Sequence, residues 1–100
     1  MAYVIKFVSV KPTGVNWFSK SGGTAQTTLA NMSAWTKSQT GYLDALGSPT
    51  GVDSYEGFVI FDTQVNGDAW LSAKVTQPDY MVHDAYFKAQ GISEIVSFYP

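Results

Sequence analysis

His83 is the only histidine in this 100-residue sequence, and it is one of the few residues suited to acid–base chemistry. Asp79 precedes it by four residues, so the two side chains would meet on one face of a helix and could share a hydrogen bond. A lone histidine can act as a proton shuttle or as a metal ligand, but a triad or a histidine-based metal site needs partners from elsewhere in the chain. We predict that His83 is a solvated or partly buried polar residue, that it binds no metal, and that the protein uses no cofactor.

The carboxylates do not have the spacing of a metal-binding loop. They stand where helix caps and first turns favour acidic side chains, at Asp62, Asp68, Asp79 and Asp84. The sequence contains no cysteine, which excludes disulfides, thiol chemistry and thiolate metal sites. The sequence therefore identifies no catalytic residues.

Charge is scarce. The net charge is −2, and charged residues make up 14% of the chain, against roughly 25% in an average domain. Six scattered lysines and no arginine argue against a nucleic-acid partner, because such binding favours a clustered basic face and arginine forks. A surface so poor in charge is typical of one covered by another subunit; a solvated surface rich in Ser and Thr is the alternative.

No segment approaches the roughly 18 apolar residues that a membrane span needs, so we expect no membrane partner. The first apolar run, 2–8, contains Lys6 within it, whereas a secretory signal carries its charge before the run. We therefore expect a strand here and take the cytoplasm as the default location.

Apolar periodicity and turn residues predict the elements of one α+β domain over 1–100. The predicted strands are 3–10, a weak 42–46, 55–61 and 92–99. The predicted helices are 25–38, a short one from an Asn66 N-cap through Ala73, and one that starts near Pro78 and ends at Gln90 before Gly91. A turn is expected at 47–51, with a loop reaching Ser54. The loop 13–24 carries Val15, Trp17 and Phe18, which would either cap the core or form a lid over a pocket.

The order β-α-β-β-α-β predicts a four-stranded antiparallel sheet with both helical regions on one face. The strands are apolar on both faces, as in 55–61, where Phe58 and Ile60 point one way and Val59 and Phe61 the other. An uncovered second face would leave large side chains in water at roughly 1.5–3 kcal/mol each. We therefore predict a homodimer that packs sheet to sheet.

Features along nearly the whole chain now support a resemblance. They are the strand that ends at Lys11-Pro12, Gly41 before the second strand, the segment 58–63, Asp68-Ala69-Trp70, Tyr80 and Tyr86 in the last helix, and the terminal strand. With them the chain resembles the dimeric α+β barrel superfamily, the ferredoxin-like group that contains the antibiotic-biosynthesis monooxygenases. The resemblance implies two sheets packed face to face and, in each protomer, a pocket between sheet and helices. The aromatic loop 15–18 and the glycines after it depart from the usual shorter connection.

Haem-degrading members of that superfamily place a histidine on the last helix and a tryptophan on the helix before it. Trp70 and His83 invite the comparison, but His83 stands one residue closer to the aromatic Tyr80 than in their pattern. A slip of one residue rotates a side chain by about 100° around a helix. The first strand also lacks their asparagine, so we do not expect haem.

We predict that the protein binds an apolar or aromatic small molecule, fatty-acid-like or polyketide- or quinone-like, between its sheet and helices. The candidate lining residues are large and apolar or amphipathic; they are Ile5, Phe7, Trp17, Phe18, Phe58, Trp70, Tyr80, Met81, His83 and Tyr86. The alternatives are a cofactor-independent monooxygenase-like enzyme and a non-catalytic assembly protein with a close-packed aromatic core. A defined cavity would disfavour the assembly protein, and an ionisable residue pointing into it would favour the enzyme.

Overall fold

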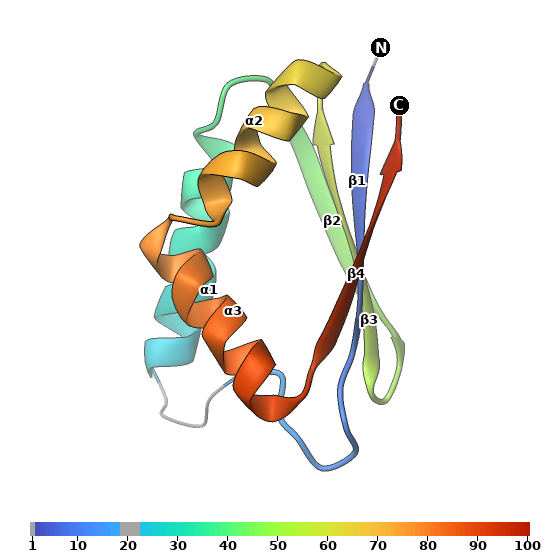
Figure 1. The fold of residues 1–100 in the computed structure, drawn as a ribbon, viewed down its shortest axis with the longest axis vertical. Coiled ribbons are helices and arrows are strands. Elements are labelled where there is room, and N and C mark those ends of the chain that lie inside the picture. The colour runs from blue at the N-terminus through green and yellow to red at the C-terminus, as the bar shows by residue number, and fades with distance from the viewer. Residues whose placement is uncertain (1, 19–22) are drawn as a thin grey trace.

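The computed structural model describes residues 2–18 and 23–100, with the side chains of 23–26 left undescribed. The elements follow the order β1 (Tyr3–Val10), α1 (Gly23–Lys37), β2 (Tyr42–Gly51), β3 (Ser54–Phe61), α2 (Gln64–Lys74), α3 (Pro78–Gln90) and β4 (Ser93–Tyr99). The strands form one antiparallel sheet in the order β2-β3-β1-β4. All three helices cover the same face of the sheet (Figure 1). The predicted fold class is confirmed, with the second helical region divided into α2 and α3.

The register of the strands assigns each side chain to a face. Tyr3 lies opposite Phe61, and Ile5 lies opposite Val59 on β3 and Phe98 on β4. Because side chains alternate along a strand, these residues share one face. Tyr3, Ile5 and Phe61 are buried there, so this face meets the helices. The sequence predicts that the two faces alternate but does not say which of them the helices cover.

The core forms where α2 lies on the central strands. Tyr3, Ile5, Phe61 and Trp70 are its buried cluster. Gly67 permits this close approach, because a Cβ atom at that position would stand 2.6 Å from the Tyr3 ring. The first turns of α2 therefore pack directly against the central strand β1.

The ends of the C-terminal helices follow standard capping. Thr63, rather than the predicted Asn66, is the N-cap of α2, and its hydroxyl accepts a hydrogen bond from the Asn66 N–H at 3.2 Å. The Asn66 side chain instead donates to Asp62 at 2.8 Å. Helix α3 begins with Pro78 and ends at Gly91, whose φ of 71° is readily adopted only by glycine.

The predicted turn at 47–51 is wrong, because β2 continues through it to Gly51 and the hairpin turns at 52–53. Proline and glycine are tolerated here because β2 is an edge strand with a bulge between Pro49 and Gly51. Gly47 also has a packing role, since the Tyr55 side chain occupies the space that a Cβ atom at this position would need. Helix α1 begins at Gly23, two residues before the predicted start, and 19–22 of the predicted loop lie outside the described residues.

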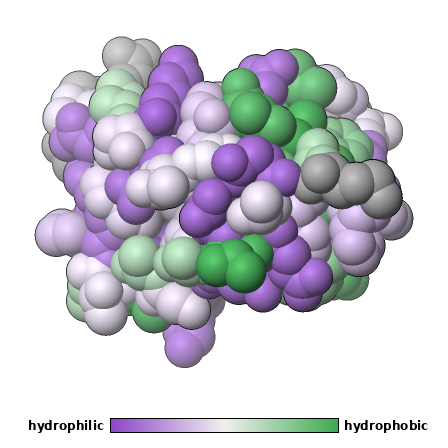
Figure 2. All heavy atoms as spheres, turned by 90° about the horizontal axis from the view of Figure 1, so that it is seen from above, coloured by the Kyte–Doolittle hydropathy of each residue, from purple (hydrophilic) through white to green (hydrophobic). Residues whose placement is uncertain are grey.

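The second face of the sheet, which we call the outer face, is left uncovered by the described residues (Figure 1). Alternation places the following apolar side chains on it: Val4, Val8, Val10, Leu46, Phe58, Ile60, Ile95 and Tyr99. Lys6 and Glu56 form an ion pair of 2.8 Å among them. From the end that carries both termini, the larger hydrophobic patch in view lies on the half occupied by the sheet (Figure 2). Among the described residues, no helix has the length and apolar character needed to cross a membrane.

Candidate functional site

A cavity of about 300 Å³ lies between the helix face of the sheet and helices α1 and α3, with the segment 11–18 as its cover. Its walls are mostly apolar and aromatic, and they come from six parts of the chain: β1, the segment 11–18, α1, β3, α3 and β4. The lining residues are Phe7, Ser9, Trp17, Phe18, Leu29, Met32, Tyr55, Gly57, His83, Phe87 and Glu94. Small-molecule sites have this character, since apolar walls provide affinity and a few polar groups orient the ligand.

The segment 11–18 is anchored at both ends. Lys11 forms an ion pair with Asp53 at 2.7 Å, and the Thr13 hydroxyl donates to the same carboxylate at 2.9 Å. The hydrogen bond from Lys11, and to a smaller extent that from Thr13, holds the pKa of the Asp53 carboxyl below its ordinary value. Near the other end, the Tyr86 hydroxyl donates to the Asn16 carbonyl at 2.8 Å. The cover is thereby fixed to the β2–β3 hairpin and to α3.

Trp17 and Phe18 form the aromatic part of the cover. The Trp17 ring packs at 6.3 Å from the ring of Tyr55 and at 6.2 Å from that of Phe87. Phe18 lies 6.0 Å from the imidazole of His83. Both side chains therefore contact cavity walls on the sheet and on α3, as a lid over a pocket would.

His83 lines the cavity from α3. Its imidazole packs 4.2 Å from the Phe87 ring, centroid to centroid. Burial lowers the pKa of His83; the Asp84 carboxylate opposes this shift, and the Lys74 charge adds to it. The neutral imidazole is therefore favoured, and in that form it can accept or donate one hydrogen bond at the cavity wall.

Glu94 lines the cavity from the sheet. It lies on β4 opposite Ser9, on the helix face of the sheet. Burial raises the pKa of Glu94, the Lys74 charge opposes the shift, and the Asp84 charge adds to it. The prediction of site residues missed Glu94. Its spacing of two and four residues from Val96 and Phe98 places all three side chains on the same face of β4, and this was the signal that could have found it.

Of the ten residues predicted to line a pocket, Phe7, Trp17, Phe18 and His83 line this cavity. The other six lie elsewhere. Ile5 and Trp70 belong to the core beside it. Phe58 lies on the outer face, because successive residues of a strand point to opposite faces and its neighbour Val59 faces the helices. Met81 is exposed on α3. Tyr86 anchors the cover through Asn16, and Tyr80 lines a neighbouring cavity of about 170 Å³ beneath α1.

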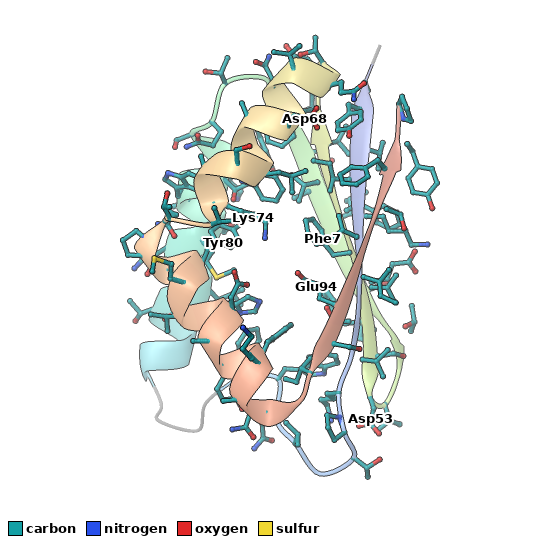
Figure 3. All side chains as sticks on the ribbon, viewed as in Figure 1. Phe7, Asp53, Asp68, Lys74, Tyr80 and Glu94 are labelled. Atoms are coloured by element: carbon teal, nitrogen blue, oxygen red, sulfur yellow. The ribbon has the colours of Figure 1, made fainter. Side chains whose placement is uncertain are left out.

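The Lys74 side chain lies beside the cavity wall formed by Phe7. The ammonium group of Lys74, at the end of α2, lies 5.3 Å from the centre of the Phe7 ring, 5.7 Å from that of Trp70 and 5.1 Å from that of Tyr80. In Figure 3, Lys74 points from the helix layer toward the sheet, where Phe7 and Glu94 face it. Over the described part of the chain, no three His, Asp or Glu side chains are grouped so that they could hold a metal ion.

Comparison with protein-family models and with curated proteins finds no match. Solved structures do match. SnoaB, a cofactor-independent oxygenase from Streptomyces nogalater, matches with a TM-score of 0.60 and 14% identity over 99% of this chain and 90% of that one. A dimeric ferredoxin-like protein of unknown function from Jannaschia sp. CCS1 matches with a TM-score of 0.58 and 13% identity over 95% and 97%. This chain has a ferredoxin-like fold.

A protein from Deinococcus radiodurans, proposed to be an antibiotic biosynthesis monooxygenase, also shares the ferredoxin-like fold. Its TM-score is 0.60 at 13% identity, over 97% of this chain and 90% of that one. The resemblance predicted from the sequence is confirmed at the level of the fold. At these identities the likeness does not extend to a reaction or a ligand.

We expect His83→Gln to remove part of the pH dependence of stability. The folded pKa of His83 lies below its ordinary value of 6.5, so as the pH falls the unfolded chain takes up a proton before the folded chain does. The wild type should therefore lose stability relative to the variant as the pH falls through 6.5 toward the folded pKa. Urea unfolding of both proteins from about pH 7.5 to 5 measures this difference. A difference in unfolding free energy that stays constant across this range would contradict the assignment.

Proposed function

We propose that the protein binds an apolar or aromatic small molecule in the cavity between its sheet and its helices. The observation that carries the proposal is the cavity itself, whose described walls are mostly apolar and aromatic and carry few strongly polar side chains, namely Ser9, His83 and Glu94. Its volume of about 300 Å³ lies at the small end of the range for ligand sites. A close-packed core, as the assembly alternative requires, would leave no such space.

The wall composition favours a planar ligand over a flexible chain. Phe7, Trp17 and Tyr55 present aromatic rings to the cavity, and aromatic groups gain energy from offset and edge-to-face contacts beyond simple burial. A quinone-like or polyketide-like ring system is therefore the preferred class, and a fatty-acid-like chain is the second.

Gly57→Val tests the cavity as the binding site. A Cβ atom at this position meets nothing closer than 3.8 Å, so the larger side chain projects into the cavity and fills part of it. We expect the affinity for any aromatic ligand to fall about tenfold or more, because overlap with the ligand forces repacking. Tryptophan fluorescence, to which Trp17 in the cavity wall contributes, and thermal shift measure binding of a panel of quinones, polyketides and fatty acids.

Ala89→Val, at an exposed position of α3, is the control for that change and should bind as the wild type does. A wild type that binds no member of the panel would reject the proposal in favour of the assembly alternative. Equal affinity in the wild type and in Gly57→Val would place the ligand outside this cavity.

A second candidate function is a cofactor-independent oxygenase, the activity of SnoaB. An oxygenase without a cofactor takes its electrons from the substrate, which must first lose a proton to become electron-rich. His83 and Glu94 are ionisable groups in the cavity wall, and burial raises the pKa of Glu94 above its ordinary value. A raised pKa makes a carboxylate a stronger base for this step.

The second candidate is tested by oxygen uptake with enolisable phenols from the same panel. We expect Glu94→Gln to lower the rate about 100-fold, which is the smaller end of a general base's contribution. Binding affinity for the phenol should change far less. Oxygen uptake that is absent in the wild type, or unchanged in Glu94→Gln, would leave binding as the function and exclude Glu94 as the base.

We further propose that two copies pack through the outer face to form a homodimer. The apolar side chains of this face lie around one ion pair, Lys6–Glu56, and Asp44 is a further charge on it, on the edge strand β2. Ile95 is 64% exposed and Leu46 is 59% exposed in the single chain, which leaves apolar surface to be buried. Two solved structures of this fold are described as dimeric, those from Jannaschia sp. CCS1 and Thermobifida fusca.

Two separate lysine substitutions, one on each face of the sheet, test the dimer. Val8 lies on the outer face, so Val8→Lys should give a folded monomer in sedimentation velocity at micromolar concentration, because an ammonium group cannot be buried there unpaired. Val59 packs against the core on the helix face, so Val59→Lys should unfold the protein instead. A monomeric wild type, or a dimeric Val8→Lys, would contradict the proposed interface.

A further inference from the structure

Lys74 lies beside a wall of the cavity, and three aromatic rings surround its ammonium group. Its ammonium group lies over the rings of Phe7, Trp70 and Tyr80 at 5.1–5.7 Å. The three rings come from β1, α2 and α3, so tertiary packing rather than local sequence assembles them. Aromatic rings attract a cation through their faces, which holds the ammonium group at the boundary between core and cavity.

No described residue accepts a hydrogen bond from the Lys74 ammonium group. An ammonium group has three donors, and a ring face accepts none of them as a full hydrogen bond. Lys6 and Lys11 each form an ion pair with a carboxylate, but no carboxylate of the described chain lies within ion-pair distance of Lys74. Its ammonium group also has no side-chain or backbone acceptor among these residues.

The Lys74 charge acts within the cavity. Phe7, one of its three rings, is also a cavity wall. The same charge influences Glu94 and His83, which line the cavity from β4 and α3. Figure 3 shows Lys74 and Glu94 on opposite sides of the space between the layers, rather than joined. Because the walls are mostly apolar, a charge here interacts more strongly than it would in water.

We propose that Lys74 is the counter-charge for an anionic group of the ligand, so that the cavity selects an aromatic acid: a ring system that carries a carboxylate or an ionised phenol or enol. This inference rests on the proposed binding function and specifies its ligand class. An anion would receive charge-assisted hydrogen bonds from the unused donors of Lys74. Its ring system would lie against Phe7 and the aromatic walls beyond.

A matched pair of probes tests the inference, 2-naphthoate and its neutral isostere 2-naphthamide. We expect the wild type to bind the acid about tenfold more tightly than the amide, since a hydrogen bond to a charged group stabilises more than a neutral one does. Lys74→Met keeps the length and apolar stem of the side chain but removes the charge, and it should abolish this preference while still binding the amide. Isothermal titration calorimetry at neutral pH measures both affinities.

Two further variants keep the outcome clear. Lys88→Met, at an exposed position in the last turn of α3, is the control and should retain the preference. Lys74→Gln provides a second neutral variant in case Lys74→Met does not fold. A wild type that binds both probes equally, or a preference that survives in the neutral variants, overturns the role of Lys74 and leaves the binding function intact. A wild type that binds neither probe contradicts the binding function itself.

Discussion

The helix layer depends on one hydroxyl group, that of Thr36. Trp70 donates its indole N–H to this oxygen at 3.1 Å, and the same hydroxyl pairs with the Tyr80 hydroxyl at 2.7 Å. The three residues lie on α1, α2 and α3, so one buried threonine connects every helix of the layer. Burial raises the pKa of Tyr80, although the bond to Thr36 opposes the shift, so its hydroxyl stays neutral at this junction. Within the described chain every buried polar side-chain atom has a partner, as a well-ordered layer requires.

The Thr36 hydrogen bonds join the helices at the boundary between the close-packed core and the cavity. On one side of it, Trp70 packs on Phe61 and Phe7 and closes the core. On the other side α1 and α3 do not fill the space above the sheet, and Trp17 and Phe18 of the cover line this cavity. Trp70 and Tyr80 also hold Lys74 at the border. The contacts that stabilise the layer thus place a cation beside the apolar cavity.

The sequence predicts the parts of this arrangement that depend on local pattern. The alternation places Tyr3, Ile5 and Phe7 on one face of the sheet, although it does not say which face the helices cover, and Gly91 marks the end of α3. The turn expected at 47–51 is wrong because glycine and proline occur in bulged edge strands as well as in turns, and β2 is such a strand. The site is less predictable, since Lys74 and Glu94 meet the cavity only through tertiary packing. The four-residue spacing from Trp70 to Lys74 was a partial signal, because such residues are neighbours on a helix.

The central claim is that ligands occupy the cavity rather than the exposed surface, and two methionines report on this most directly. Met32 is buried and lines the cavity from α1, whereas Met81 is 54% exposed on α3 and lies outside it. Methyl NMR spectra of the ¹³C-methionine-labelled protein, recorded during a titration with 2-naphthamide, follow both positions at once. We expect the Met32 methyl resonance to shift saturably while that of Met81 stays in place. A Met32 resonance that does not move while the probe binds would contradict the account.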